Sequence, residues 1–433
     1  MKMNTLNPAQ QLCLVMSRIY DAKLTTVSGG NLSLKDKEGN IWVTPSGGDK
    51  GRYQASDMLK ICPDGTIEGK RKASMETGIH RSILMDRPEF TAIVHAHPPA
   101  LVAISLMHQL PETAMLPWIA QQVKGIRLAG YGCPGTEALR AAVARAFQTD
   151  INTAILANHG AFIASEKGLS DAFAIFQNLD VSVRIQAKAA SLTGQMPHLI
   201  SKEKLDDYHS AKAPQFEALA VGERTQKERE VRKSILDLAG RAYNRDFLTS
   251  SVGVISARVE EDLFVITVSG ADNASLGDED LVLVKGYMAE KGKTPAKSAL
   301  LHQKIYEENP EIQSIIMAAP PNAMVFAVTD LDYDVRTIPE CYIVLREMKK
   351  FPFGSTINGQ KELAAYLGPN SPVAIVENDC FICTGSSVFN AFDRLEVAEF
   401  SAEAVWNVKL LGGHPISITE NQIIDLKKNF GII

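Results

Sequence analysis

Several features that would assign the chain quickly to a class of protein are scarce or missing. Only six of its 433 residues are cysteines, too few and too scattered for a disulfide scaffold, so we expect reduced thiols and a cytoplasmic protein. No apolar run approaches the roughly 18 residues of a membrane span. Neither sign of charge dominates, because 45 Lys and Arg residues face 50 Asp and Glu residues. Nothing therefore indicates a nucleic-acid surface or a membrane segment.

Two further patterns carry little information. Cys380 and Cys383 form a single C-x-x-C pair without a second pair. A zinc or redox role stays open, but two apolar strand thiols are the favoured interpretation. The first 16 residues carry polar side chains where a signal peptide needs an unbroken apolar segment. Asn7 followed by Pro8 instead predicts the start of a helix.

What the chain does contain is the stretch AIVHAHPP at residues 92–99. Ile93 and Val94 predict a buried strand. His95 and His97 are two positions apart, so on a strand their imidazoles project from one face and can bind one metal ion. A chance pair on an exposed edge strand is the alternative.

Short strands and helices alternate along the first half of the chain, which indicates an α/β layered fold. Glycine loops at residues 28–31 and 44–48 lie at strand ends, where their N–H groups can meet an anion, although each alone is more typical of a turn. Besides the strand of AIVHAHPP, apolar periodicity predicts strands at 31–34, 41–44 and 153–157 and helices at 75–85, 100–107, 136–147 and 169–192.

The second half of the chain repeats the first at a nearly constant shift. The segment at Leu24 matches the one at Leu248 (248 − 24 = 224). The repeat keeps apolar positions and loses polar ones: His95 becomes Met317, His97 becomes Ala319, His159 becomes Asp379, Glu76 becomes Ser298 and Tyr131 becomes Phe353. Joint loss of three histidines and a glutamate is what the removal of one metal site would leave, so we predict a metal site in the first copy only.

A polar and charged stretch separates the two copies. We predict one α/β domain over residues 1–205, with the metal site, and a degenerate one over residues 230–433, without the metal ligands. Residues 206–229 between them are interpreted as a linker.

Six motifs follow one another in the first copy: SGGNLS, TPSG, ASMETGIH, HAHPP, YGCPGTEAL and ANHG. In this combination the chain resembles the class II aldolase/adducin family, typified by the fuculose-phosphate and rhamnulose-phosphate aldolases. The resemblance covers residues 12–194, and a degenerate version covers 231–412. It implies two tandem class II aldolase-like domains of three αβα layers, each with a central mixed or antiparallel sheet flanked by helices.

The resemblance also implies a metal site. One zinc ion per chain, or another divalent metal, would be held by His95, His97 and His159, and three imidazoles leave a coordination position open, as in catalytic sites. Glu76 would shuttle a proton close to the metal, whereas by itself it is an ordinary acid in the first turn of a helix. Tyr131 matches a tyrosine that acts as an acid at a neighbouring subunit's site; a half-buried loop tyrosine is the alternative.

By the same resemblance, three loops would hold the substrate phosphate. The third loop usually carries two small hydroxyl residues, and here Met75 takes the second place, so one phosphate donor is missing. The residues concerned are Gly30, Asn31, Ser46, Gly47 and Ser74.

These features predict a zinc-dependent aldolase, a lyase that cleaves a ketose or ketose phosphate through a metal-stabilised enediolate. A decarboxylase of a 3-oxo sugar acid or its phosphate, and a pentulose-phosphate epimerase, are the alternatives among enzymes. An adducin-like, non-catalytic interaction scaffold is the alternative of another class. By resemblance to the family's four-fold rings, two tandem chains would complete a pseudo-four-fold ring as a homodimer.

Overall fold

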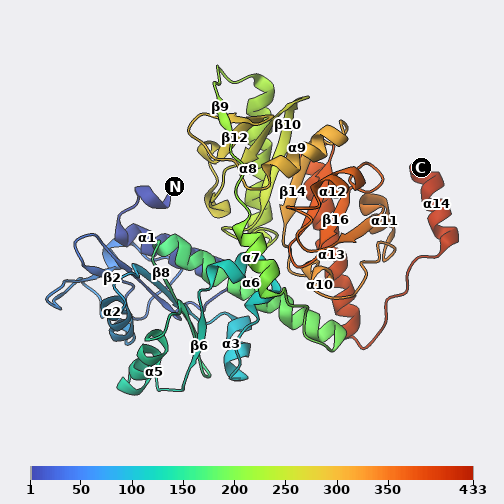
Figure 1. Ribbon diagram of the computed structural model, residues 1–433. Helices are drawn as coiled ribbons and strands as arrows, with labels where there is room; N and C mark the ends of the chain where they lie inside the picture. Colours follow the sequence, from blue (N-terminus) through green and yellow to red (C-terminus); the bar gives the residue numbers. More distant parts are fainter. Residues whose placement is uncertain (1, 433) are drawn as a thin grey trace. The chain divides into compact units, whose positions relative to one another are not determined.

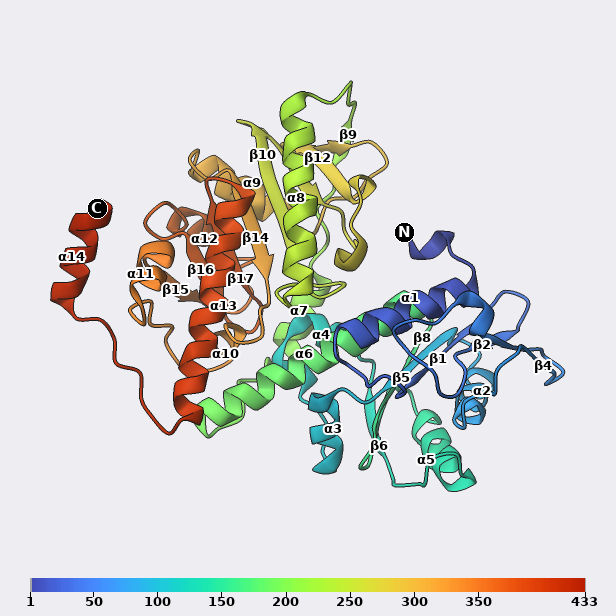
Figure 2. The same cartoon turned by 180° about the vertical axis from the view of Figure 1, so that it is seen from behind.

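Two mixed β-sheets organise residues 2–432, which the computed structural model describes (Figures 1 and 2). One unit comprises the chain up to residue 113 together with residues 118–184. The other comprises residues 114–117 together with the chain from residue 185 onward. Each unit has its own sheet, as the predicted tandem repeat requires.

The first sheet has eight strands in the order β4-β3-β2-β1-β5-β8-β7-β6. Its pairs are antiparallel except β6 with β7. The strands are β1 (Asn31–Lys35), β2 (Ile41–Val43), β3 (Leu59–Ile61), β4 (Ile67–Glu68), β5 (Ala92–Ala96), β6 (Ile126–Ala129), β7 (Thr153–Leu156) and β8 (Gly160–Ser165).

Helices cover both faces of this sheet. Apolar side chains of α2 (Thr77–Asp86) and α5 (Glu137–Phe147) pack on one face in a single buried cluster, and α1 (Pro8–Asp21) packs against β1 and β2. Figure 1 shows α1 on the side of the sheet opposite α2 and α5. The remaining helices of this half of the chain are α3 (Pro99–Leu106), α4 (Pro117–Gln122), α6 (Leu169–Thr193) and the 3-10 turns η1 (Met3–Thr5), η2 (Ala55–Asp57) and η3 (Thr113–Met115).

The second sheet has nine strands in the order β15-β16-β17-β14-β10-β11-β12-β13-β9. Read from β13 to β15, this is the order of the first sheet from β4 to β6. The repeat seen in the sequence is therefore a repeat of topology. The strands are β9 (Glu217–Leu219), β10 (Val254–Glu260), β11 (Leu263–Thr267), β12 (Leu281–Lys285), β13 (Met288–Glu290), β14 (Ser314–Ala318), β15 (Met348–Phe351), β16 (Val373–Val376) and β17 (Cys380–Gly385).

The helices of the second half follow the same plan. Residues of α9 and α12 pack with the sheet in one buried cluster, while α8 and α13 contact each other and strands β10, β14 and β17. The helices are α7 (Lys202–Ser210), α8 (Gln226–Asn244), α9 (Ala299–Glu308), α10 (Met324–Ala327), α11 (Pro339–Leu345), α12 (Gln360–Tyr366), α13 (Val388–Leu410), α14 (Glu420–Phe430) and the 3-10 turns η4 (Asn273–Ser275) and η5 (Asp278–Asp280).

The elements predicted from the sequence agree with those observed to within two residues. Helix α1 begins at Pro8, and the side chains of Asn7 and Gln10 cap its first turn reciprocally. The helix predicted from residue 75 begins at Thr77, because Glu76 takes the position before the first helical residue. Strands β3, β4, β6 and β8 were missed. The first three have only two to four residues, and β8 is buried at every position, so none shows an alternating pattern.

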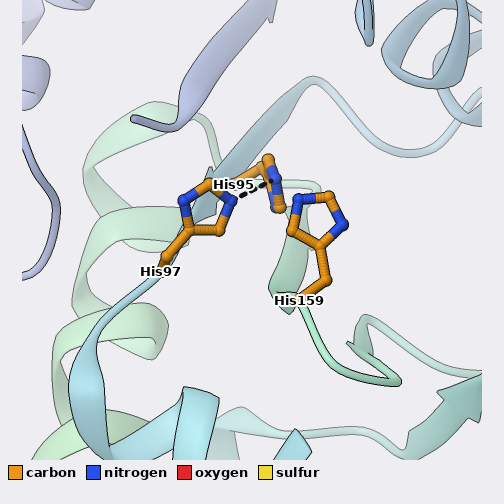
Figure 3. A group of neighbouring side chains, drawn as sticks. All are labelled: His95, His97 and His159. Carbon is orange, nitrogen blue, oxygen red and sulfur yellow. Dashed lines mark hydrogen bonds between the residues drawn. The ribbon is translucent and has the colours of Figure 1, made fainter. Parts of the chain in front are cut away.

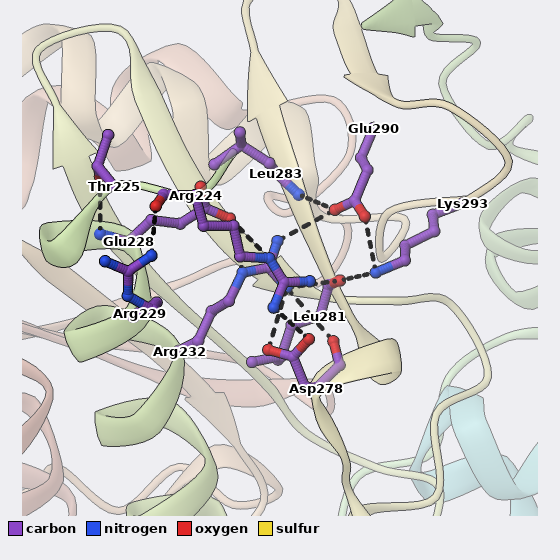
Figure 4. A network of polar contacts seen from close by, with 10 residues as sticks. All are labelled: Arg224, Thr225, Glu228, Arg229, Arg232, Asp278, Leu281, Leu283, Glu290 and Lys293. Atoms are coloured by element: carbon purple, nitrogen blue, oxygen red, sulfur yellow. Dashed lines mark hydrogen bonds and ion pairs between the residues drawn. The ribbon is translucent and has the colours of Figure 1, made fainter. Parts of the chain in front are cut away.

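The stretch predicted as a linker contains regular structure. Strand β9 pairs in parallel with β13 at the edge of the second sheet. Arg224 forms an ion pair with Asp278, and the buried Arg232 donates hydrogen bonds to Glu228 and Glu290 (Figure 4). The charges of this stretch thus attach it to the second unit, and the exact domain boundaries remain a proposal.

Two expectations from composition can be compared with the fold. Cys380 and Cys383 are buried, free thiols in β17, as favoured over a zinc or redox pair. Burial raises the pKa of both thiols, which makes them poor metal ligands. None of the helices in residues 2–432 combines the length and apolar character that crossing a bilayer requires.

Candidate metal centre and active site

Three histidines converge at one end of the first sheet (Figure 3). His95 lies in β5, His97 follows the strand by one residue, and His159 lies in the turn between β7 and β8. Their ring centroids are 4.8, 4.9 and 5.1 Å apart, and one nitrogen from each lies within 4.8 Å of the other two. The predicted spacing of two residues on a strand has therefore placed two rings together, and the turn adds the third.

The orientation of His95 leaves one nitrogen available for a metal. Its Nδ1 donates a hydrogen bond of 2.9 Å to the carbonyl oxygen of Ala161, so the lone pair is on Nε2. The ring is fully buried and stacks on Phe162, with centroids 4.0 Å apart. Neighbours on both sides thus hold the ring in one orientation.

The distances fit a shared cation. Nε2 of His95 and Nε2 of His97 are 3.1 Å apart, close to the roughly 3.3 Å that separates two nitrogens bound tetrahedrally to one zinc at ~2.0 Å. Burial lowers the pKa of His97 to about 3, helped by the charges of His95 and His159. A neutral imidazole is the form that binds metal. The donor set of this structure could therefore hold a metal ion.

Glu76 faces these histidines from the start of α2. Its Oε2 is 3.2 Å from Nε2 of His95, and its Oε1 is 3.6 Å from Nε2 of His159. The side chain of Asn31 donates a 2.7 Å hydrogen bond to Oε2. Burial by itself would raise the pKa of Glu76, but His95, Asn31 and His159 outweigh it and lower the pKa below its usual range. The group is thus held as a carboxylate against the ligand nitrogens.

A chain of hydrogen bonds that the sequence did not predict supports Glu76. Ser33 donates to Nδ1 of His80 at 2.7 Å, and Nε2 of His80 donates to the amide oxygen of Asn31. Burial lowers the pKa of His80 to about 3, so the ring is neutral and can make both bonds. Only the helical position of His80 and the alternation of β1 pointed to these partners. Asn31, predicted to hold substrate, has its side chain engaged in orienting Glu76.

The other loops predicted to bind substrate lie close to this centre. Gly30 has a φ of +74°, and a Cβ there would lie 2.7 Å from the carbonyl oxygen of His95, so only glycine allows this approach. The backbone of Ser46 donates a hydrogen bond of 2.9 Å to the carbonyl of Lys72. This bond joins the loop of Ser46 and Gly47 to the segment that carries Ser74 and Glu76.

Tyr131, a residue of the predicted set, and Met75, which takes the place of a hydroxyl residue, are both exposed. Tyr131 follows β6 and is 70% exposed, and no hydrogen bond within residues 2–432 joins it to the histidines. Met75, in place of the missing hydroxyl residue, is 66% exposed. Tyr131 thus lies at the surface of the unit.

The corresponding place in the second copy is filled differently. Asp379, at the position of His159, accepts hydrogen bonds of 3.1 Å from the hydroxyl of Tyr208 and 2.8 Å from that of Thr356. The ring of Tyr208 in α7 stacks on Phe353, with centroids 5.1 Å apart. Met317 pairs with Val254 as His95 pairs with Asn31. The polar cluster of the first copy is thus replaced by a tyrosine from α7.

Comparisons with known proteins identify the family of the chain. The family description "Class II Aldolase and Adducin N-terminal domain" matches residues 10–187 and again residues 233–406. The chain is similar to 3-oxo-tetronate 4-phosphate decarboxylase of Escherichia coli (strain K12), 26% identical over 161 residues, which are 36% of this chain and 76% of that protein. It is similar to L-fuculose phosphate aldolase of the same organism, 26% identical over 191 residues, which are 44% of this chain and 86% of that protein.

A solved structure is also similar. L-fuculose-1-phosphate aldolase from Thermus thermophilus aligns with 27% identity and a TM-score of 0.39, covering 43% of this chain and 96% of that one. The two segments matched by the family description extend over most of both halves of the sequence. The chain therefore belongs to the class II aldolase and adducin family, whose domain it contains twice.

Proposed function

We propose that the first copy is a metal-dependent lyase of the cytoplasm that cleaves a ketose or ketose phosphate, with His95, His97 and His159 as ligands of one zinc ion. One observation carries the proposal: the imidazoles of three histidines and the carboxylate of Glu76 converge in the first copy. The relatives include an L-fuculose phosphate aldolase, which supports a sugar phosphate as substrate.

Different residues of the first copy would have different roles in the reaction. A divalent metal bound here supplies a Lewis acid that stabilises negative charge on the substrate. Glu76 would move a proton at the carbon or oxygen of the substrate that becomes free. Asn31 holds Oε2 of Glu76, and His80 holds Asn31, so the carboxylate keeps one orientation. The loops of Gly30, Ser46 and Ser74 would bind the anionic group of the substrate.

Decarboxylation is the second candidate reaction. Four of the relatives are named 3-oxo-tetronate 4-phosphate decarboxylase. Loss of carbon dioxide from a 3-oxo acid and cleavage of a ketose both leave negative charge next to a carbonyl group, so the same centre would serve either. A pentulose-phosphate epimerase would use it as well.

The second copy is proposed to be non-catalytic. It lacks the three histidines and the glutamate, and Tyr208 fills their place. An adducin-like scaffold role for the entire chain is the alternative, and metal content distinguishes the two. We further propose a homodimer of tandem chains in a pseudo-four-fold ring, in which only the first copies bear metal.

The test combines metal analysis with a substrate screen. The purified chain is assayed for zinc, iron, cobalt and manganese, and then offered ketose phosphates, unphosphorylated ketoses and 3-oxo sugar acids, with and without added metal. Aldehyde release indicates the aldolase, and carbon dioxide release indicates the decarboxylase. About one metal ion per chain is expected; a chain without metal and without turnover would contradict the enzyme and favour the scaffold.

A further inference from the structure

Lys50 is a buried lysine that the reaction proposed above leaves without a role. Its side chain is only 2% exposed, and it follows the loop of Pro45, Ser46 and Gly47. Within residues 2–432 no carboxylate forms an ion pair with it. Burying an ammonium group without a partner of opposite charge is costly, so such a group indicates a site for an anion.

The ammonium group of Lys50 contacts that loop and Tyr53. Nζ donates a hydrogen bond of 3.0 Å to the hydroxyl of Tyr53 and approaches the carbonyl oxygen of Pro45 at 3.4 Å. Tyr53 donates in turn to the carbonyl oxygen of Gly47. An ammonium has three donors, and these two neutral acceptors leave one free.

The loop itself carries further donors. Gly47 and Gly48 have φ angles of +64° and +87° and are exposed. In the described part of the chain, their N–H groups and the hydroxyl of Ser46 have no hydrogen-bond partner. Lys50 and Tyr53 donate to the carbonyl oxygens of Pro45 and Gly47, and the N–H groups of Gly47 and Gly48 remain available to an anion.

The second copy provides an internal control. The loop TPSGGDKGRY at residue 44 corresponds to TVSGADNASL at residue 267, so Lys50 corresponds to Asn273 (273 − 50 = 223). One backbone hydrogen bond is shared: the N–H of Lys50 donates to the carbonyl of Val27, and the N–H of Asn273 to that of Ser250, both at 2.9 Å. The amide of Asn273 bonds to the carbonyls of Thr249 and Val252 and does not reach the loop. The fold of this segment therefore does not need the lysine.

We propose that Lys50 is a positioning residue that supplies positive charge to a phosphate-binding loop formed by residues 44–48 of the first copy. It compensates for the hydroxyl group that Met75 replaces, and it makes the centre selective for a phosphorylated substrate. This inference rests on the proposed function, whose substrate class it narrows. Burial lowers the pKa of Lys50 to about 8, while the charge of Glu76 acts in the opposite direction.

The experiment measures the binding of inorganic phosphate to the metal-loaded chain by calorimetry, which needs no turnover. Lys50→Met and Lys50→Asn are expected to weaken phosphate binding about tenfold or more, the range for losing a charged hydrogen-bonding group. Lys50→Asn introduces the residue that the second copy accommodates. Lys37→Met, which removes an exposed lysine, is the matched control and is expected to bind as the unchanged chain does. Metal content and melting temperature are measured for each variant.

The pH profile gives a second reading that a purely structural role would not produce. The groups facing Lys50 are Tyr53, whose pKa burial raises to about 12, and Glu76. Lys50 is charged below a pH of about 8 and neutral above it, so phosphate affinity is expected to fall as the pH rises through that value and to change less in Lys50→Met. Equal phosphate affinity in both Lys50 variants and the unchanged chain, or no phosphate binding at all, would overturn the proposal. Phosphate binding without turnover of any sugar phosphate would contradict the proposed function only.

Discussion

The two copies differ at one equivalent place in their sheets: the first copy carries a cluster of histidines with a glutamate there, and the second carries an aspartate covered by Tyr208. In both, a serine of the central strand bonds to a helix histidine at 2.7 Å, Ser33 with His80 and Ser256 with His302. In the first copy this pair supports Asn31 and Glu76. In the second, Nε2 of His302 has no protein partner. The fold thus persists where the histidine cluster and the glutamate are missing, because strand pairing and apolar packing hold the sheet.

The turn after β7 and its equivalent after β16 lead to the same conclusion. Asn158 and Asn378 precede His159 and Asp379, and both have positive φ, +57° and +53°. Asparagine tolerates this conformation better than most residues. The turn that presents the third histidine is therefore preserved in the copy where it presents an aspartate to Tyr208. The backbone geometry of the turn can therefore be kept while the side chain that it presents is replaced.

The largest expected effect is the removal of a ligand. His95→Ala should abolish metal binding and activity while the unit stays folded, because the equivalent strand carries Met317 and remains paired in the second sheet. His95→Met, which copies that residue, should behave alike. Metal content of the purified variants is the measurement.

The matched control for this variant is His414→Ala, which removes an exposed histidine of the second copy. It should retain the full metal content. A His95→Ala chain that still binds metal stoichiometrically would refute the ligand assignment and remove the main difference between the copies.

The next effect concerns Glu76, whose counterpart is Ser298. Glu76→Gln should keep the metal and lower turnover by about 10²–10⁴-fold, the usual contribution of a general acid or base. The carboxamide has the same size but cannot carry a proton. Steady-state kinetics on the substrate found in the screen measure the loss, and Glu38→Gln in an exposed turn is the control. Turnover within a few-fold of the unchanged chain would exclude Glu76 from proton transfer.

A smaller effect is expected at Asp379 in the second copy, which accepts hydrogen bonds from Tyr208 and Thr356. Burial raises the pKa of Asp379 to about 6, against the hydrogen bonds from Thr356 and Tyr208, which lower it. The folded state therefore holds a proton that the unfolded state releases near the ordinary value of 3.8, and stability falls as the pH rises from about 4 to about 6. Asp379→Asn should remove this loss, which amounts to about 3 kcal/mol or less.

Thermal unfolding at pH 5 and pH 8 tests this. The gain in melting temperature for Asp379→Asn over the unchanged chain should be larger at pH 8. Tyr208→Phe should instead destabilise, since it leaves Asp379 with one donor fewer, and Tyr287→Phe at an exposed position should be neutral. The same gain at both pH values would show that Asp379 is not protonated in the folded protein.

The smallest effect is expected at Tyr131, where the second copy has Phe353. In the proposed ring, metal-bearing domains alternate with metal-free ones, so Tyr131 would meet a centre without ligands. Tyr131→Phe should change turnover only a few-fold, and light scattering should give the mass of a dimer. A rate loss of about a hundredfold, the lower range for a positioned acid, would assign Tyr131 a catalytic role, and a monomer would refute the ring.

The layered fold, the pairing of two histidines and the duplication could be predicted from the sequence. The alternation of short apolar strands with amphipathic helices predicted the layered fold, and the spacing of His95 and His97 predicted two rings on one face. The repeat predicted which copy keeps the centre. Strands β3, β4, β6 and β8 and the structure within residues 202–219 were not predicted, because short strands, a strand buried at every position and polar segments give no periodic signal and acquire regular structure only by pairing with distant residues.

The sequence by itself determined the duplicated topology and which copy carries the three histidines that cluster, since both follow from patterns that can be read along the chain. Only the tertiary structure decided what surrounds them. Asn31 and Glu76 are 45 residues apart and Tyr208 and Asp379 are 171 apart, and no local pattern records that such pairs will bond. The burial of Lys50 is of the same kind, because a lysine shows its charge in the sequence, whereas its surroundings come from the folding of distant segments around it.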